Sequence, residues 1–171
     1  MGRVHIRPAL PSELSAIGDL RVAAYQADGY LAPPSTYAGA LRALGIDGDG
    51  DVLAAVDDGA VVGTIMLQPW PHAGEVAHGP DEAEIRALAV APRARGRGAG
   101  KALLAAALEL AGGRGVRHLV LLTLPGMRSA QHLYQAAGFR RLPDRDQSPH
   151  PGLVLLAYGL LLGPEPGRAV G

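Results

Sequence analysis

The order of elements in the second half of the chain restricts the fold more than any other feature. An apolar segment at 84–90 predicts a strand, and apolar residues at helical spacing over 101–111 predict a helix that follows it. Segment 118–124 is almost entirely apolar, which is typical of a strand buried on both faces. A strand, a crossover helix and a second strand form a βαβ unit with parallel strands. The sequence therefore predicts an α/β fold.

The rest of the chain supplies further strands and helices. Residues 11–27 carry apolar residues at helical spacing, and Asp57-Asp58-Gly59 between two apolar segments predicts a β-hairpin. The other expected elements are hairpin strands at 52–56 and 60–67, short strands at 4–7 and 139–142, helices at 35–44, with Ser35 as N-cap, and at 128–137, and an apolar strand at 153–161 that leaves a homodimer open. We expect one domain over residues 1–162, with helices on both faces of a single sheet, and a disordered tail over 163–171.

Composition excludes several kinds of protein. Hydrophobic residues make up 48% and charged residues 19% of the 171 residues, as in a globular domain. The longest apolar run has ten residues, about half of what a membrane-spanning helix needs, and the N-terminal residues contain no apolar signal segment. The chain has no cysteine, and its six histidines show no metal-ligand spacing. We expect a soluble, cytoplasmic protein without disulfides, bound metal or membrane association.

Charge is unevenly distributed along the chain, although the formal net charge is zero. Residues 1–84 carry four arginines against twelve acidic residues, a formal charge of −8, and residues 85–171 carry eleven arginines and one lysine against four acidic residues, a formal charge of +8. The asymmetry suggests that the second part binds an anion, with solvated surface charge as the plainer alternative. Nucleic acid is not expected, because one Phe and one Trp provide no aromatic stacking platform beside the arginines.

The loop between the first strand and the helix, 93–101, has the sequence RARGRGAGK. Glycines allow its backbone N–H groups to approach a ligand, and a helix N-terminus favours an anion. The side chains of Arg95, Arg97 and Lys101 add positive charge. The spacing fits neither a Walker A loop, which needs glycine at 95 and serine or threonine at 102, nor a dinucleotide fingerprint, which needs glycine at 101. The loop therefore predicts a phosphate or pyrophosphate site, and a flexible surface turn is the alternative.

Two sequence blocks resemble motifs of the GNAT superfamily of N-acetyltransferases. The first block, Leu88-Ala89-Val90-x-Pro92-x-x-Arg95-Gly96-x-Gly98-x-Gly100, is similar to the acetyl-CoA motif with its Gln/Arg-x-x-Gly-x-Gly/Ala core. The second block, Ala130-x-x-Leu133-Tyr134-x-x-x-Gly138-Phe139, is similar to a later motif of the family and lies at the usual distance. The resemblance implies the GNAT fold, which is a single mixed, mostly antiparallel sheet with a parallel βαβ core and helices on both faces.

The resemblance implies acetyl-CoA as the cosubstrate and assigns residues that bind it. Residues 88–90 match the strand whose backbone pairs with the pantetheine arm, and a bulge in this strand is expected to separate it from its parallel neighbour. Residues 95–101 match the pyrophosphate loop. Met127 stands where the family often has asparagine, so a hydrogen bond from that side chain to the cofactor is either lost or replaced by one from Ser129 or Arg128. The implied cofactor-binding residues are Leu88, Ala89, Val90, Arg95, Gly96, Arg97, Gly98, Ala99, Gly100, Lys101 and Ser129.

The resemblance also implies two catalytic residues. Glu84 matches a position where many family members carry a general base, and in a regular strand it lies on the same face as Leu88. Glu82 and Glu75 are alternatives for this role, and Glu84 could also be an ordinary solvated glutamate at a strand end. Tyr134 matches the tyrosine that protonates or hydrogen-bonds the leaving thiolate, with a purely structural core aromatic as the alternative.

These assignments predict an acetyl-CoA-dependent N-acetyltransferase. A primary amine of a small molecule, peptide or protein is expected to attack the thioester directly in a ternary complex. A catalytically idle acyl-CoA-binding regulatory domain and an acyltransferase that uses another acyl-CoA stay open. The resemblance places the acceptor pocket among the first helices, the loop after residue 68 and the loop 143–152. Acidic residues in this half of the chain favour a cationic amine; they include Asp28, Glu75, Asp81 and Glu82.

Overall fold

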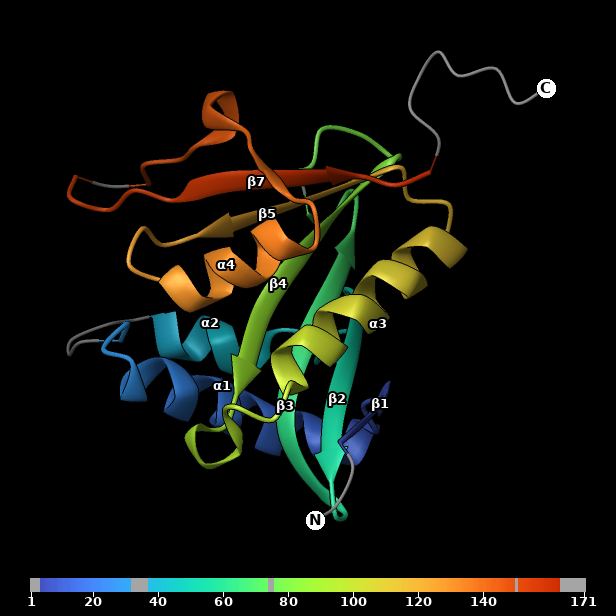
Figure 1. Ribbon diagram of the computed structural model, residues 1–171, viewed down its shortest axis with the longest axis vertical. Helices are drawn as coiled ribbons and strands as arrows, with labels where there is room; N and C mark the ends of the chain where they lie inside the picture. The colour runs from blue at the N-terminus through green and yellow to red at the C-terminus, as the bar shows by residue number, and fades with distance from the viewer. Residues whose placement is uncertain (1–3, 32–36, 74–75, 150, 164–171) are drawn as a thin grey trace. The chain divides into compact units, whose positions relative to one another are not determined.

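Seven strands form one sheet in the computed structural model, which describes residues 4–31, 37–73, 76–149 and 151–163 (Figure 1). The strand order is β1-β2-β3-β4-β5-β7-β6. Strands β4 and β5 run parallel, and the pairs β1–β2, β2–β3, β5–β7 and β6–β7 are antiparallel. The strands are β1 (His5–Pro8), β2 (Asp51–Asp57), β3 (Ala60–Pro69), β4 (Glu82–Val90), β5 (His118–Thr123), β6 (Arg140–Arg141) and β7 (Leu156–Leu161). The predicted mixed, mostly antiparallel sheet with a parallel core is confirmed.

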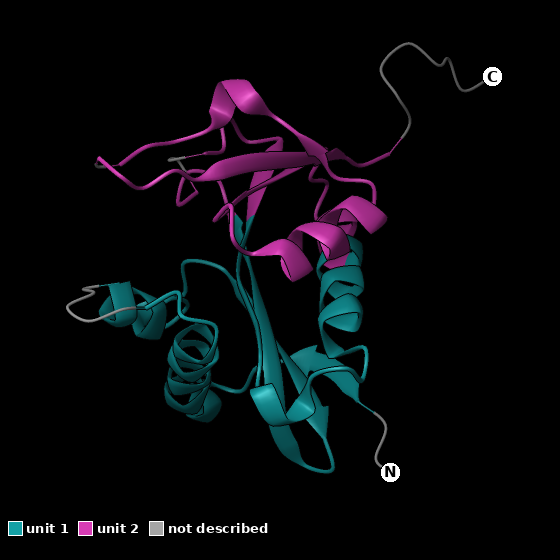
Figure 2. Ribbon diagram, turned by 60° about the vertical axis from the view of Figure 1, so that its left-hand side comes forward, with its two compact units in different colours: residues 1–68, 85–109 teal, residues 69–84, 110–171 magenta. Residues whose placement is uncertain are grey.

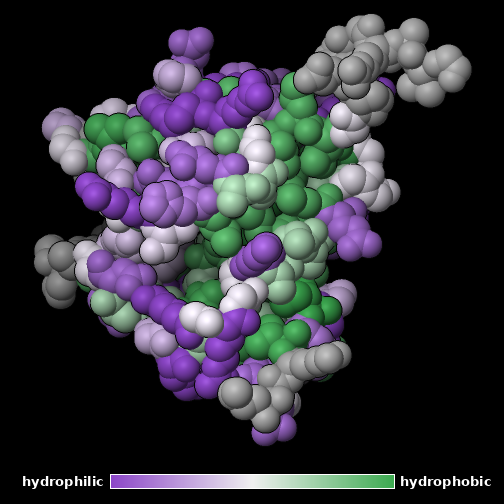
Figure 3. Space-filling model, in the orientation of Figure 1, coloured by the Kyte–Doolittle hydropathy of each residue, from purple (hydrophilic) through white to green (hydrophobic). Residues whose placement is uncertain are grey.

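Helices and 3-10 turns connect these strands in the described part of the chain. They are α1 (Leu14–Ala27), α2 (Tyr37–Ala43), α3 (Ala99–Gly113), α4 (Arg128–Ala136), η1 (Pro11–Glu13), η2 (Pro92–Ala94) and η3 (Pro143–Arg145). Only Lys101 and Glu109 are charged among the fifteen residues of α3, and hydrophobic residues gather along this helix on the face shown in Figure 3. None of these helices is long and apolar enough to cross a membrane.

The chain divides into two compact units (Figure 2). The first unit contains residues 1–68 and 85–109, and the second contains residues 69–84 and 110–171. Strand β4 begins in the second unit and ends in the first, so the division does not follow chain order. One domain over residues 1–162 stays a prediction. Residues 164–171 of the expected tail lie outside the described residues, as do Ser35 and Glu75.

The β2–β3 hairpin of the first unit has the turn that its sequence predicts. Asp57 pairs with Ala60, and the two residues between them, Asp58 and Gly59, have φ angles of +50° and +79°. Two central residues with positive φ define a type I′ turn, whose twist matches that of the flanking strands. Aspartate followed by glycine is among the pairs that adopt this conformation most readily.

Helices pack on both faces of this hairpin, as predicted. On one face, Ile17 of α1 belongs to a buried cluster with Val52, Ala54 and Val56 of β2. The other face carries Gly63 of β3, where an added Cβ would lie 3.0 Å from Leu103 of α3. Successive residues of a strand point to opposite faces of the sheet, which explains why α1 and α3 contact different residues of β2 and β3. An added Cβ at Gly63 would also lie 3.1 Å from the Ala89 carbonyl oxygen, so a side chain at this position would require its neighbours to shift by a few tenths of an ångström.

The second unit is organised around β5. Leu119, Val120 and Leu121 are almost fully buried, which confirms a strand covered on both faces. Val120 contacts Ala73, Val76 and Ala77 from the loop before β4, and Leu142 packs against this cluster. The unit therefore builds its core from segments on both sides of α3 in the sequence.

Several element boundaries differ from the prediction, among them those of β4, α3 and β7. Strand β4 starts at Glu82 rather than 84, because Glu82 pairs with His118 in the parallel ladder. Helix α3 starts at Ala99 rather than 101 and continues through the two glycines to Gly113. Strand β7 starts only at Leu156, since Leu155 forms an isolated bridge with Gln147. Each difference arises where pairing or a helix terminus outweighs the local composition.

Candidate functional site

The glycine loop connects β4 to the N-terminus of α3 within the first unit. Gly96 and Gly98 have φ angles of +80° and +79°, in the left-handed region that favours glycine. The first hydrogen bond of α3 runs from the Ala102 N–H to the Gly98 carbonyl at 3.0 Å. The backbone N–H groups of residues 96–101 find no backbone carbonyl in the described part of the chain. A run of such donors at a helix N-terminus can bind a phosphate or pyrophosphate.

The arginine side chains of the loop have other partners. Arg95 binds Asp28, the C-cap residue of α1, through two hydrogen bonds of 2.6 and 3.0 Å. It also reaches the Val90 carbonyl at 3.4 Å. Arg97 donates to Asp57 at 2.8 Å. These guanidinium groups therefore hold the loop against α1 and the β2–β3 turn, and the backbone N–H groups remain the main donors for an anion.

Lys101 is the third cation of the loop. Its side chain is exposed in the first turn of α3, and within the described residues it has no ion-pair partner. The sequence predicted the same role for all three cations. In the structure, Arg95 and Arg97 have carboxylate partners, and Lys101 has none among the described residues. Asp28 and Asp57 lie far from the loop in sequence, so no local pattern could have identified these pairs.

Strand β4 is irregular at the position where a bulge was expected. Its parallel pairing with β5 covers only Glu82–Glu84, although β4 continues to Val90. Ala87 has a φ angle of +52°, which is rare for a residue with a side chain and strained within a strand. This irregularity interrupts the alternation, so the expectation that Glu84 and Leu88 share a face no longer follows from strand geometry.

Glu84 lies at the last paired position of β4, opposite Val120 of β5. It is only 6% exposed. An ordinary solvated glutamate at a strand end would be largely exposed, so that alternative is wrong for this structure. A buried carboxylate next to the irregular part of β4 is a reasonable position for a general base.

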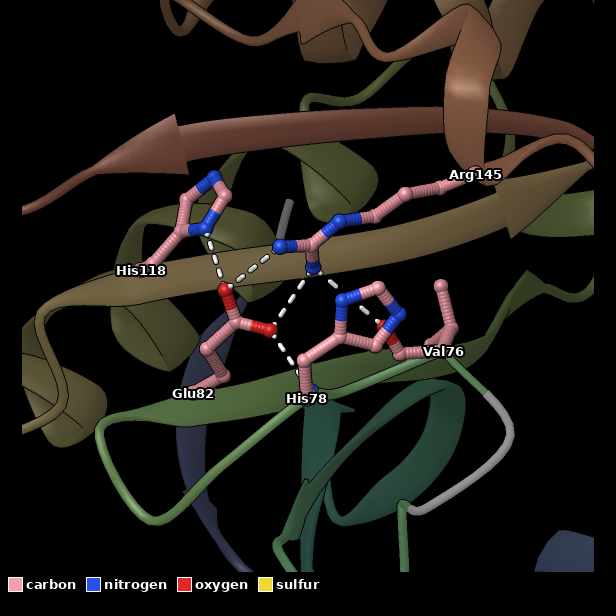
Figure 4. A network of polar contacts seen from close by, with 5 residues as sticks. All are labelled: Val76, His78, Glu82, His118 and Arg145. Atoms are coloured by element: carbon pink, nitrogen blue, oxygen red, sulfur yellow. Dashed lines mark hydrogen bonds and ion pairs between the residues drawn. The ribbon is translucent and has the colours of Figure 1, made fainter.

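Glu82, the alternative base, is held by several donors (Figure 4). Arg145 of η3 donates to both carboxylate oxygens at 2.7 and 3.0 Å, and the His78 N–H donates at 2.8 Å. Nδ1 of His118 lies 2.7 Å from the same carboxylate. Burial by itself raises the pKa of Glu82. The hydrogen bonds from Arg145, His78 and His118 together have the larger, opposite effect, so the pKa is lowered to about 2. Such a carboxylate is a weak base, which favours Glu84 for proton removal.

Tyr134 is buried in α4 of the second unit. Its ring packs against Phe139 with the ring centroids 5.7 Å apart. Among the described residues, the hydroxyl group has no hydrogen-bond partner. Burial raises the pKa of Tyr134, so the hydroxyl stays protonated at neutral pH. A protonated hydroxyl without a partner is available to donate to a ligand.

The start of α4 shows what occupies the place of the expected asparagine. Met127 is the N-cap residue of α4, and its sulfur accepts a hydrogen bond from Thr123 at 3.5 Å. Ser129 and Arg128 are exposed on the first turn. Gln131, which the sequence analysis did not consider, donates to the Leu124 and Pro125 carbonyls and so fixes the loop before the helix.

The predicted residues thus lie in two groups. Residues 88–90 and 95–101 belong to the first unit, whereas Glu84, Ser129 and Tyr134 belong to the second. Within the first group, β4 leads directly into the glycine loop. No group of three or more residues of the types that bind metal is found among the described residues.

Comparison with known proteins identifies the class. The model of the acetyltransferase (GNAT) family matches residues 15–139, and the chain belongs to this family. A mycothiol acetyltransferase of Cellulomonas flavigena is 36% identical over 91 residues, which are 52% of this chain but only 26% of that relative.

Solved structures of the family share the fold. A GNAT-family acetyltransferase of Staphylococcus aureus aligns with a TM-score of 0.75 and 18% identity over 94% of this chain and 99% of its own. A phosphinothricin acetyltransferase of Sinorhizobium meliloti, solved in complex with acetyl-CoA, aligns with a TM-score of 0.68 and 24% identity over 94% of this chain and 89% of its own. At these identities the likeness establishes the fold.

Proposed function

We propose that the chain transfers an acetyl group from acetyl-CoA to a primary amine by direct attack in a ternary complex. The observation that carries this proposal is the run of backbone N–H groups at residues 96–101, between β4 and the body of α3. Family membership supports the choice of acetyl-CoA, and a related structure was solved with that molecule.

Backbone groups do most of the binding in this proposal. The N–H groups of residues 96–101 hold the pyrophosphate, and Lys101 adds a positive charge beside it. The β4 backbone at residues 88–90 pairs with the pantetheine arm in the manner of an added strand. Arg95 and Arg97 act indirectly, because their carboxylate partners keep the loop in place.

Two side chains move protons. Glu84 takes a proton from the acceptor ammonium, directly or through water, so that the neutral amine can form the new C–N bond. The C–S bond of the thioester breaks, and Tyr134 hydrogen-bonds the departing thiolate or protonates it while the second proton of the attacking nitrogen replaces the proton of the tyrosine. Because burial raises the pKa of Tyr134, its hydroxyl acts as a hydrogen-bond donor to the thiolate and does not persist as a phenolate. Correct orientation of the two reactants supplies much of the remaining rate enhancement.

An idle acyl-CoA-binding domain and an enzyme for another acyl-CoA are the competing functions. The available Tyr134 hydroxyl favours catalysis over binding alone. Thiol release from acetyl-CoA, measured across a panel of amines, separates an active enzyme from an idle domain. The same assay with longer or acidic acyl-CoA molecules separates the acyl groups.

Gly98→Val tests the cofactor loop. At a φ angle of +79° valine is strained by about 1–2 kcal/mol, and its side chain enters open space beside the loop, where a bound pyrophosphate would lie. We expect acetyl-CoA affinity, measured by calorimetry, to fall at least about 100-fold.

Gly48→Val is the matched control. Gly48 also has a positive φ angle, +72°, and open space around an added Cβ, but lies in the turn before β2. Both variants should lose similar stability in thermal denaturation, and only Gly98→Val should lose acetyl-CoA binding. Equal affinity of the two variants would refute the assignment of the loop.

A further inference from the structure

A fully buried arginine lies between α1 and α2 in the first unit. Arg21 of α1 is 0% exposed. Its Nη1 donates to the carbonyls of Leu41 and Leu44, at the C-terminal end of α2, at 2.9 Å each. Its Nε and Nη2 atoms are also buried, but they have no acceptor in the described part of the chain. One edge of the guanidinium therefore holds two unused donors.

An arrangement of this kind is costly for a structural residue. Buried charged groups are ordinarily paired and hydrogen-bonded, because desolvation without partners is strongly unfavourable. Burial lowers the pKa of Arg21 to about 10, so the group still carries its charge at neutral pH. Capping α2 uses only Nη1 and leaves the other edge of the guanidinium unexplained.

Arg86 of β4 provides a second cation in the same region. Its Nη1 donates to the side-chain oxygen of Gln68 at 3.0 Å, and the Gln68 amide donates to Asp49 at 2.9 Å. The second oxygen of Asp49 accepts from the Gly45 N–H at 3.1 Å. The charge of Arg86 contributes to the lowered pKa of Arg21, so the two guanidinium groups lie within the range of electrostatic interaction. The four residues Arg21, Asp49, Gln68 and Arg86 are named the arginine cluster.

We propose that the arginine cluster binds a carboxylate of the acyl acceptor, so that the acceptor is an amine that also carries a carboxylate, as an amino acid does. Adjacent Nε–H and Nη2–H donors on one edge of a guanidinium match the two oxygens of a carboxylate. The amine half of this inference rests on the proposed function, whereas the anion site rests on the unused donors.

A carboxylate can reach Arg21 only if a part of the surrounding structure moves. Arg21 is enclosed and Arg86 is half-buried, so the proposal requires the carboxylate to approach from the side of Arg86. The element that must yield is α2, which has seven residues and buries only Leu41. Binding then replaces the missing acceptors of Arg21 and secures α2 against α1.

Two of the four acidic residues on which the expectation of a cationic acceptor rested have arginine partners in the structure. Asp28 is paired with Arg95, and Glu82 is paired with Arg145. Glu75 lies outside the described residues. Two of the four acidic side chains that were expected to attract a cation are thus paired with arginines, whereas Arg21 has two donors without an acceptor among the described residues.

The test compares acceptors that differ only in the carboxylate. Each amino acid of a panel is assayed by thiol release beside its amide and its decarboxylated amine, with purified protein and acetyl-CoA. We expect kcat/KM to be about tenfold to 100-fold higher for the acid than for either analogue, mainly through KM. Equal turnover of all three forms would overturn the proposal.

Two variants assign the effect to the cluster. Arg21→Lys keeps a positive charge that can cap α2 but removes the adjacent Nε–H and Nη2–H donors. Arg86→Gln removes the charge of the half-buried guanidinium. Each should raise KM for the acid about tenfold or more and leave the amide unchanged. Arg42→Gln is the control, because Arg42 is an exposed cation of α2 that pairs with Asp19. An equal loss for acid and amide would reveal a structural role and overturn the proposal.

A binding measurement separates this inference from the proposed function. N-acetylated amino acids and their amides are added to the CoA-bound protein in thermal denaturation. We expect only the acids to raise Tm, and Arg21→Lys to remove the increase. If no amine releases thiol but this difference persists, the proposed function fails and the anion site stands. Equal effects of acid and amide would overturn the anion site even in an active enzyme.

Discussion

The hydrogen bonds and the ion pair around Glu82 allow its contribution to stability to be estimated in advance. The pKa of Glu82 is about 2 in the folded protein, against an ordinary value of 4.5. A difference of one in pKa corresponds to about 1.4 kcal/mol, so the interactions of ionised Glu82 contribute about 3 kcal/mol to folding. The carboxylate side chain is only 12% exposed, so solvent screening reduces this contribution little.

The direction of the pKa change fixes the pH range of the effect. Because the folded-state pKa is the lower one, the unfolded chain takes up the proton first as the pH falls. The contribution of Glu82 is therefore complete above about pH 5 and is lost progressively towards about pH 2.

Glu82→Gln isolates this contribution. The free energy of unfolding of both proteins is measured by urea denaturation from about pH 2 to pH 8. The difference between wild type and variant should shrink by about 3 kcal/mol on acidification through that range. The carboxyl groups of Glu13 and Asp146, whose pKa values are also lowered, occur in both proteins and cancel.

Asp144→Asn is the control for this measurement. Asp144 is an exposed carboxylate of η3, and the described residues offer it no ion pair. Its substitution should leave the pH dependence of stability unchanged. If the difference for Glu82→Gln is equally independent of pH, the donors around Glu82 do not stabilise the folded state and the reasoning is refuted.

The remaining predictions concern the proton carriers. Tyr134→Phe should lower kcat at least about 100-fold with little change in acetyl-CoA affinity, because the hydroxyl acts on the developing thiolate; a parallel loss of affinity in calorimetry would indicate a binding role instead. Glu84→Gln should lower kcat/KM most at low pH, where the acceptor amine is protonated, and the deficit should shrink as the pH rises. A pH profile that matches wild type would assign the base to another group.

Local chemistry explains why much of the fold could be predicted. The type I′ turn depends on Asp58 and Gly59 themselves, and the left-handed backbone of the loop depends on Gly96 and Gly98. The buried strand β5 follows from a continuous apolar run. Each of these features is determined within a few residues, so the order of elements and the position of the glycine loop could be inferred from the sequence by itself.

Only the tertiary structure decided which charged groups meet. Arg145 reaches Glu82 across 63 positions of sequence, and Arg95 reaches Asp28 across 67. From its sequence context Arg21 is an ordinary polar residue of an amphipathic helix, yet packing against α2 buries it and leaves two of its donors without an acceptor among the described residues. The pKa of a carboxylate and the satisfaction of a donor depend on the groups that folding brings within about 3 Å, and sequence spacing carries no information about those neighbours.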